Sequence, residues 1–230
     1  MKTQHTATFL AMLMAGASST ALAQSVPATT TAEAPVALQE VIVTSMKRSE
    51  NLRNVPAAIS AISATALSKA GVFETSDLSH IAPNLQVSSP YGSQQPNFTV
   101  RGIGVGTEFN ANAASPVGVY VDEVYQAFRS SHGQQLYDLD QVEVVRGPQG
   151  TLYGRNATGG VVNILTNRPK DRYDASVTLD GGNYNSQRLQ GYVNVPFGDT
   201  FAVRAAVNVL KRDGFATNTV LNVNEDNRDL

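Results

Sequence analysis

The stretch from Val142 to Thr166 constrains the fold more than any other part of the chain. It begins and ends with β-branched, apolar runs, at 142–146 and 161–165, which are typical of strands. The residues between them include Gly147-Pro148, Gly150, Gly154 and Gly159-Gly160, a spacing that favours a compact loop with positive φ angles or close backbone approach. The pattern predicts a strand, a tight loop with a half-turn of helix, and a second strand. A glycine-rich loop of an ordinary α/β protein is the alternative.

The first residues have the character of an export signal. Lys2 and His5 precede a short apolar run at 9–17, and Ala21-Leu22-Ala23 offers small residues where a signal peptidase cleaves. The apolar run is too short for a permanent transmembrane helix. We therefore predict a signal peptide over residues 1–23 and an exported mature chain. A buried N-terminal helix is the alternative.

The composition argues against several classes of function. The chain has no cysteine, so disulfides and thiolate metal sites are excluded. Only His80 and His132 follow the signal peptide, which leaves little material for a histidine-based metal or catalytic site. The formal net charge is −2 and the longest basic run is Lys47-Arg48, so nucleic-acid binding has no electrostatic footprint. After the signal peptide no run is long and apolar enough for a helical membrane span. We expect no cofactor and no metal.

Residues 24–54 are predicted to form a disordered leader that contains one strand-forming run. Alanine, threonine and proline dominate its first part, which has almost nothing to bury. The run Glu40-Val41-Ile42-Val43-Thr44 then stands alone between polar residues, with no hairpin partner beside it. Such a run is suited to pairing with the sheet edge of another chain.

A folded domain is predicted from Val55 to Pro169, and it is long enough for one modest core. Strands and short helices alternate, which indicates an α+β domain with a mixed sheet. The expected strands are 56–61, 85–88, 98–101, 117–121, 142–146 and 161–165, the expected helices are 63–70 and 76–81, and a helical turn is expected at 136–139.

Residues 170–230 have a different texture, in which polar and apolar residues alternate. The alternating runs are 175–180, 188–195 and 201–210, separated by Gly181-Gly182-Asn183 and Pro196-Phe197-Gly198-Asp199. Antiparallel strands with one polar and one apolar face are typical of the opening of a transmembrane β-barrel. An antiparallel hairpin of a soluble sheet is the alternative.

From about Gln39 to Leu210 the chain resembles the TonB-dependent outer-membrane receptors. The stretch at 142–166 closely resembles the end of their plug domain, and Phe98-Thr99-Val100-Arg101-Gly102 and Val145-Arg146-Gly147-Pro148 match two Arg-Gly elements of that domain. The resemblance implies an α+β plug followed by the first strands of a transmembrane barrel, which in this family has 22 strands and a plugged lumen. It also implies that Glu40–Thr44 is the Ton box, which reaches into the periplasm and pairs with the energy-transducing protein TonB.

The resemblance also assigns roles to side chains. Arg101 and Arg146 are expected to pair with acidic residues of the inner barrel wall, where a buried guanidinium needs carboxylate partners. Two surface arginines at strand ends are the alternative. The loops after Gly102 and after Val121 are expected to face outward and contact ligand through Thr107, Glu108, Phe109, Asn110, Tyr125, Gln126 and Phe128. These side chains suit a siderophore, an oligosaccharide, or packing within the plug.

The resemblance predicts the N-terminal part of an outer-membrane receptor for energy-coupled uptake of a scarce ligand, such as a ferric siderophore. TonB and its inner-membrane energising complex are the expected partners. The residues after Lys170 number 230 − 170 = 60, whereas a complete barrel needs roughly 200 in strands, which indicates a fragment or a truncated gene. The alternatives are a non-transporting plug that acts as a periplasmic binding module and, third, an enzyme, for which no catalytic constellation is present.

Overall fold

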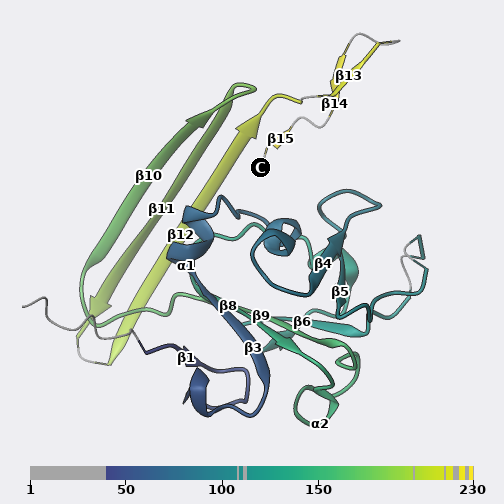
Figure 1. Cartoon of the computed structure of the whole chain (residues 1–230). Helices are drawn as coiled ribbons and strands as arrows, with labels where there is room; N and C mark the ends of the chain where they lie inside the picture. The colour runs from purple at the N-terminus through teal and green to yellow at the C-terminus, as the bar shows by residue number, and fades with distance from the viewer. Residues whose placement is uncertain are drawn as a thin grey trace, which may run out of the picture. The chain divides into compact units, whose positions relative to one another are not determined.

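The computed structural model describes residues 40–107, 109–110, 113–198, 200–214, 216–219, 223–225 and 228–229. The predicted signal peptide (1–23), the leader up to residue 39 and Glu108 lie outside these residues and stay predictions. Figure 1 shows the course of the chain. Residues 40–54 were predicted to be disordered, and this is wrong, because they form the strands β1 (Ile42–Val43) and β2 (Glu50–Asn51) and the 3-10 helix η1 (Leu52–Asn54).

A five-stranded mixed sheet forms the centre of the domain, in the strand order β3-β8-β9-β6-β7. Strands β6 and β9 are parallel, and all other neighbours in the sheet are antiparallel. The central strands β8, β9 and β6 are almost continuously buried, as expected for strands that are covered on both faces. The predicted α+β domain with a mixed sheet is confirmed. The strands are β3 (Ala58–Ser63), β6 (Val117–Val121), β7 (Val124–Tyr125), β8 (Leu139–Arg146) and β9 (Gly160–Thr166).

Alternate residues of the sheet face two different cores, because successive side chains of a strand point to opposite faces. Val142 and Val144 of β8 lie in the larger, first core, whereas Val145 lies in the second. The first core also holds Leu78 and Phe98, both fully buried. It is covered by α1 (Ala64–Lys69), the 3-10 helix η2 (Thr75–His80) and the hairpin of β4 (Leu85–Ser88) with β5 (Asn97–Val100).

The second core lies on the side of the sheet that β1 and the short helix α2 (Gly150–Tyr153) cover (Figure 1). Val43 of β1 is fully buried in it, against Val145 and Val161 of the central strands. Tyr120 and Tyr153 complete its aromatic part, with ring centroids 4.8 Å apart. The second core therefore ties the start of the described chain to the middle of the sheet.

Two of the predicted helical segments differ in the structure. The helix predicted at 76–81 is the 3-10 helix η2, at whose start the Asp77 carboxyl group accepts the backbone N–H groups of Phe73 and Glu74. The helical turn predicted at 136–139 is wrong. Leu136 and Leu139 are both buried in the first core, but Leu139 begins β8, and Gln135 forms a β-bridge with Glu74. The spacing of Leu136 and Leu139, three positions apart, therefore results from the burial of both in the first core and does not indicate a helix.

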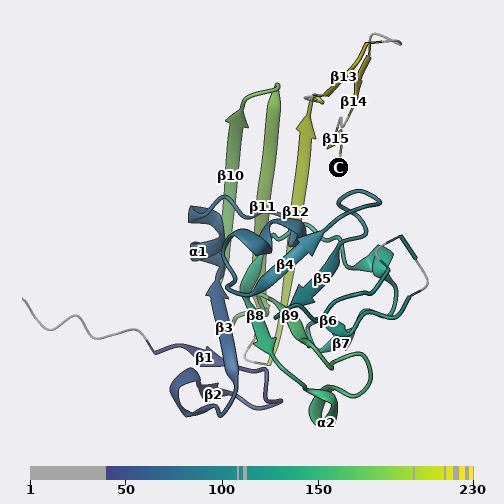
Figure 2. The ribbon, with the colours of Figure 1, turned by 45° about the vertical axis from the view of Figure 1, so that its right-hand side comes forward.

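Three long antiparallel strands follow the mixed domain and confirm the strands predicted after residue 170. They lie side by side in Figures 1 and 2, and β11 pairs with both of its neighbours along most of its length. The strands are β10 (Asp174–Gly182), β11 (Ser186–Phe197) and β12 (Phe201–Arg212); β15 (Arg228–Asp229) pairs with the end of β12, and β13 (Ala216–Asn218) with β14 (Val223–Glu225) forms a separate hairpin. Within the described ranges, no helix is long and apolar enough to cross a membrane.

Charged side chains of the long strands contact the mixed domain. Arg204 of β12 donates from Nε to the Asp138 carboxylate over 2.8 Å, and both side chains are nearly buried. The guanidinium of Arg188 in β11 lies 3.8 Å from the ring centroid of Phe73, which is a cation–π contact. Arg188 and Arg204 are therefore both partnered by side chains of the mixed domain.

Gly160 tests the close packing of the sheet, because it begins β9 between β6 and β8. A Cβ atom at this position would lie 2.4 Å from the backbone oxygen of Val145. We expect Gly160→Ala to lower the free energy of unfolding by about 1–3 kcal/mol, as overpacking does. Gly150→Ala is the matched control, since its Cβ would meet no atom within 4 Å. Urea denaturation measures both, and equal stability of the two variants would contradict the packing described.

Candidate functional site

The candidate site is built around the N-terminal segment, which we define as residues Glu40–Lys47. Its strand β1 pairs with β2, with Ile42 opposite Asn51 and Val43 opposite Glu50. The expectation that this run has no hairpin partner is therefore wrong. The chain reverses after Thr44, whose carbonyl accepts the N–H of Lys47, a residue with a φ of 61°. No glycine marks this turn, so the sequence carried no local signal for it.

Glu143 holds the segment from the opposite side. It is the charged residue in the middle of β8, and it is fully buried. One carboxyl oxygen accepts the backbone N–H of Thr44 over 2.7 Å and the Thr44 hydroxyl over 3.3 Å, and the other accepts the hydroxyl of Ser45. Gln141 donates to the same carboxyl group over 2.7 Å. All of these partners donate to the carboxyl oxygens of Glu143, and among the described residues no cation forms a salt bridge with it.

Gln141 adds a second contact to the strand. Its side-chain nitrogen donates to the backbone carbonyl of Ile42 over 3.0 Å. Gln141 and Glu143 are two residues apart in β8 and therefore lie on the same face of the sheet. Together they contact the backbone of Ile42 and Thr44, which are also two residues apart.

Two tyrosines anchor the turn that follows. The Tyr153 hydroxyl donates to the carbonyl of Ser45 over 2.7 Å, and the Tyr120 hydroxyl donates to the carbonyl of Tyr153 over 2.7 Å. The Lys47 ammonium lies 4.8 Å from the Tyr153 ring centroid and 3.5 Å from a carboxylate oxygen of Glu123. Burial and the nearby carboxylates of Glu143 and Glu123 raise the pKa of Tyr153 well above its usual range, so its phenol is a neutral donor at physiological pH.

The five residues predicted as the Ton box divide into exposed and held groups. The side chains of Val41 and Ile42 are 41% and 44% exposed, and Glu40 accepts a hydrogen bond from the Asn51 amide. Val43 is fully buried, and Thr44 is bound to Glu143. The segment therefore presents an apolar patch to solvent while its backbone is engaged.

Arg101 and Arg146 both contact the backbone at 83–84, since the N–H of Arg101 donates to the carbonyl of Asn84 over 3.0 Å and Arg146 donates to that of Pro83. Nη1 of Arg146 donates to the Ser60 hydroxyl over 2.9 Å and to the Pro83 carbonyl over 3.2 Å. Arg101 is exposed, and a Cβ on Gly147 would lie 3.9 Å from its Nη1 atom. Among the described residues, no carboxylate forms a salt bridge with either arginine.

The residues predicted to contact ligand do not all gather in one place. Phe109 and Phe128 are exposed, and the ring of Phe109 makes an edge contact with Tyr91. Tyr125 instead packs on Tyr120 in the second core, with ring centroids 5.4 Å apart, and its hydroxyl accepts from Asn156. The chain reaches Tyr125 through a tight turn at Asp122-Glu123, where both φ angles are positive, and so returns directly to the sheet.

The other predicted contact residues are held by the loop backbone. The carbonyl of Thr107 accepts the N–H of Asn110 over 3.1 Å. The N–H of Gln126 donates to the carbonyl of Val119 over 2.9 Å, and the carbonyl of Gln126 lies 3.1 Å from Nε2 of His132. Burial lowers the pKa of His132, which favours the neutral ring. In the described part of the chain no group of three or more acidic or histidine side chains could hold a metal ion.

Residues 51–161 match the family model described as TonB-dependent Receptor Plug Domain. The chain carries a TonB-dependent receptor plug. This range includes β3, β6, β7, β8, the start of β9 and the two arginines predicted to contact the barrel, whereas the rest of β9 and Val43 of the second core lie outside it. The resemblance inferred from the Arg-Gly elements is thereby confirmed.

Known proteins similar to the chain include a receptor and an outer-membrane protein. The pesticin receptor of Yersinia pestis is 36% identical over 132 residues, which cover 56% of this chain and 19% of that protein. The iron-regulated outer membrane virulence protein of Vibrio cholerae is 25% identical over 193 residues, which cover 76% of this chain and 28% of that protein. The chain thus spans less than a third of the length of these relatives.

Solved structures extend the similarity to the long strands. The crystal structure of the ferric yersiniabactin uptake receptor from Yersinia pestis matches 76% of this chain and 26% of that one, with a TM-score of 0.65 and 29% identity. The siderophore receptor PiuA from Acinetobacter baumannii matches 74% of this chain and 23% of that one, with a TM-score of 0.61. At 20% identity, the second match shows the fold alone.

Tyr153 leads to a prediction for alkaline pH. Its pKa is raised in the folded plug above the unfolded value of 10.0, so its contribution to stability is complete below that pH and is lost as the pH rises above it. We expect Tyr153→Phe to lose less stability than the unmodified chain between about pH 9 and pH 12, although it is less stable at pH 7 because the Ser45 carbonyl loses its donor. Tyr173→Phe is the control, since Tyr173 is exposed. Urea denaturation across this range measures the effect, and an unchanged alkaline slope in Tyr153→Phe would contradict it.

Proposed function

We propose that the chain forms the plug, the TonB-binding segment and the first wall strands of an outer-membrane receptor that imports a ferric siderophore. Ligand binds to the loops at one end of the plug, and the N-terminal segment then becomes available at the other end. TonB pairs with the segment and pulls on it, using the proton gradient of the inner membrane. The plug shifts, and the ligand enters the periplasm.

The geometry of the N-terminal segment carries this proposal. A partner that adds a strand needs extended backbone whose donors and acceptors can be released from other contacts, together with accessible side chains. Ile42 and Val43 form a strand, the side chains of Val41 and Ile42 are exposed, and the segment is held by a few hydrogen bonds and one buried valine. Such a segment can dissociate without unfolding the sheet below it.

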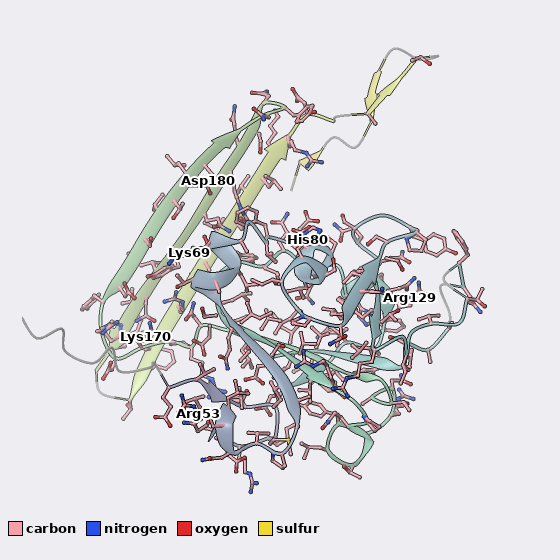
Figure 3. All side chains as sticks on the ribbon, in the orientation of Figure 1. Arg53, Lys69, His80, Arg129, Lys170 and Asp180 are labelled. Atoms are coloured by element: carbon pink, nitrogen blue, oxygen red, sulfur yellow. The ribbon has the colours of Figure 1, made fainter. Side chains whose placement is uncertain are left out.

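The loops that carry Tyr91, Phe109 and Phe128 support the proposal that ligand binds at one end of the plug. In Figure 3, Arg53, in η1 beside the N-terminal hairpin, lies well apart from Arg129, which begins the 3-10 helix η3 (Arg129–Ser131) directly after Phe128. The exposed rings of Tyr91, Phe109 and Phe128 suit stacking on the aromatic or conjugated groups of a siderophore. Similar proteins include receptors named for ferric yersiniabactin uptake and for siderophores, which supports the same class of ligand here.

The long strands support a place in the outer membrane. Apolar residues of β10–β12 such as Val177, Leu179 and Val207 are exposed, whereas Arg188 and Arg204 point to the mixed domain. Alternation of this kind suits a barrel wall with lipid outside and the plug inside. Arg101 and Arg146 would then face carboxylates of other wall strands.

Uptake by the source bacterium tests the proposal. Under iron limitation, cells are supplied in turn with the ferric complexes of a catecholate, a hydroxamate and a phenolate siderophore. We expect Ile42→Pro to abolish uptake of at least one of them, because proline removes a backbone donor from the strand. Ile42→Val is the matched control and should retain uptake. If deletion of the gene changed uptake of no siderophore, the proposed ligand class would be wrong.

The two arginines allow a second test. In the chain itself, Arg101→Ala should leave the free energy of unfolding unchanged, because Arg101 is exposed and forms no salt bridge with a carboxylate of the described residues. Arg146→Ala should cost about 1 kcal/mol, through the loss of its bonds to Ser60 and Pro83. Chemical denaturation measures both. A loss of several kcal/mol at Arg101 would show a buried partner within the chain and contradict the proposed contact with the barrel wall.

A further inference from the structure

The backbone groups of residues 42–44 are covered on one edge by two side chains instead of a strand. Gln141 donates to the carbonyl of Ile42 over 3.0 Å, and Glu143 accepts the N–H of Thr44 over 2.7 Å. Within a strand, the N–H and C=O groups of residues i and i+2 point to the same edge, and they are the groups that a neighbouring antiparallel strand would bond. Gln141 and Glu143, themselves two residues apart, therefore imitate a pairing strand.

The other edge of the segment is also occupied. The carbonyl of Val41 accepts the N–H of Leu52 over 2.9 Å, and Val43 pairs with Glu50 of β2. Strand addition requires an open edge. In the docked arrangement, both edges of residues 41–44 are in use, so an incoming strand must first displace one of these sets of contacts.

The two side chains act as a unit. Gln141 donates to the Glu143 carboxyl group over 2.7 Å, and the Thr44 and Ser45 hydroxyl groups donate to the same carboxyl group. Glu143 is fully buried, whereas Gln141 is partly exposed. If the segment leaves, the carboxyl group loses its donors from Thr44 and Ser45, which is costly for a buried acceptor. The need to satisfy Glu143 therefore favours the docked segment.

We propose that Gln141 and Glu143 form an edge lock, which masks the backbone of residues 42–44 and sets the affinity of the chain for TonB. The proposal rests on the proposed function, in which TonB binds this segment. Affinity for a state that is only fractionally populated is reduced by that fraction. Weakening the edge lock raises the undocked fraction and tightens binding, up to the affinity of a free peptide with the same sequence.

The test is a calorimetric titration of the purified periplasmic domain of TonB with the whole chain in detergent. A synthetic peptide of residues 38–48 serves as the unlocked reference. We expect the peptide to bind tightest, the unmodified chain weakest, and Glu143→Gln to gain about tenfold in affinity, which corresponds to about 1.4 kcal/mol. Gln141→Met should also gain, by a smaller factor, because Glu143 keeps its bonds to Thr44 and Ser45.

Glu50→Gln is the matched control. It replaces a carboxylate in the same hairpin on the other edge of β1, where Glu50 pairs with the exposed Arg48, and it should bind as the unmodified chain does. Gln141→Met keeps the test decisive if Glu143→Gln fails to fold, since its site is partly exposed. Unchanged or weaker binding by the lock variants that fold would overturn the edge lock. A peptide that fails to bind TonB would instead overturn the proposed function itself.

Discussion

The carboxyl group of Glu143 connects the centre of the sheet to the start of the described chain, and the arrangement of the second core depends on it. A buried carboxyl group must find donors, because leaving it unsatisfied costs more than a typical hydrogen bond contributes. The donors available are the backbone of Thr44, the hydroxyl groups of Thr44 and Ser45, and the Gln141 amide. Docking of the N-terminal segment therefore supplies hydrogen-bond donors to Glu143 of the sheet, and Glu143 in turn holds the segment in place.

The two faces of the sheet serve different contacts. The first core packs under α1, η2 and the β4–β5 hairpin, and the long strands reach the same domain through Arg188 and Arg204. The second core receives β1 and α2. The central strands thus lie between the N-terminal segment, which is proposed to bind TonB, and the elements that cover the first core. A pull on the segment acts on β8 through the bonds made by Glu143 and on α2 through Tyr153.

Much of this fold can be predicted from the sequence, because the patterns that indicate its strands and helices are local. The apolar runs and glycines of 142–166 predict β8, α2 and β9, and the alternation after residue 170 predicts β10–β12. The helix predicted at 63–70 is α1, which Ser63 caps and which Gly71 follows with a positive φ angle. The prediction of a helical turn at 136–139 was wrong because the structure there depends on tertiary contacts. Leu136 follows the β-bridge between Gln135 and Glu74, and Leu139 begins β8. Both are therefore buried by β pairing and not by a helix.

The site was less predictable for the same reason. The bond from Thr44 to Glu143 joins residues 99 positions apart, so no local pattern can show it. The one available signal was a glutamate inside the apolar run at 142–145, since a buried charge requires partners. Tyr125 was expected to contact ligand because the resemblance places the loop after Val121 at the outer face. The turn at Asp122-Glu123 contains no glycine to mark it, although both residues have positive φ angles. That turn returns Tyr125 to a position opposite Tyr120.

Hydrogen exchange of the N-terminal segment, followed by mass spectrometry, tests the docking most directly. In the purified chain without ligand, peptides that span residues 40–47 should exchange far more slowly than the same sequence free in solution. The backbone N–H of Thr44, bound to a fully buried carboxyl group, should be among the protected amides. Exchange of this segment at the rate of an unstructured peptide, while β8 and β9 remain protected, would contradict its docking on Glu143.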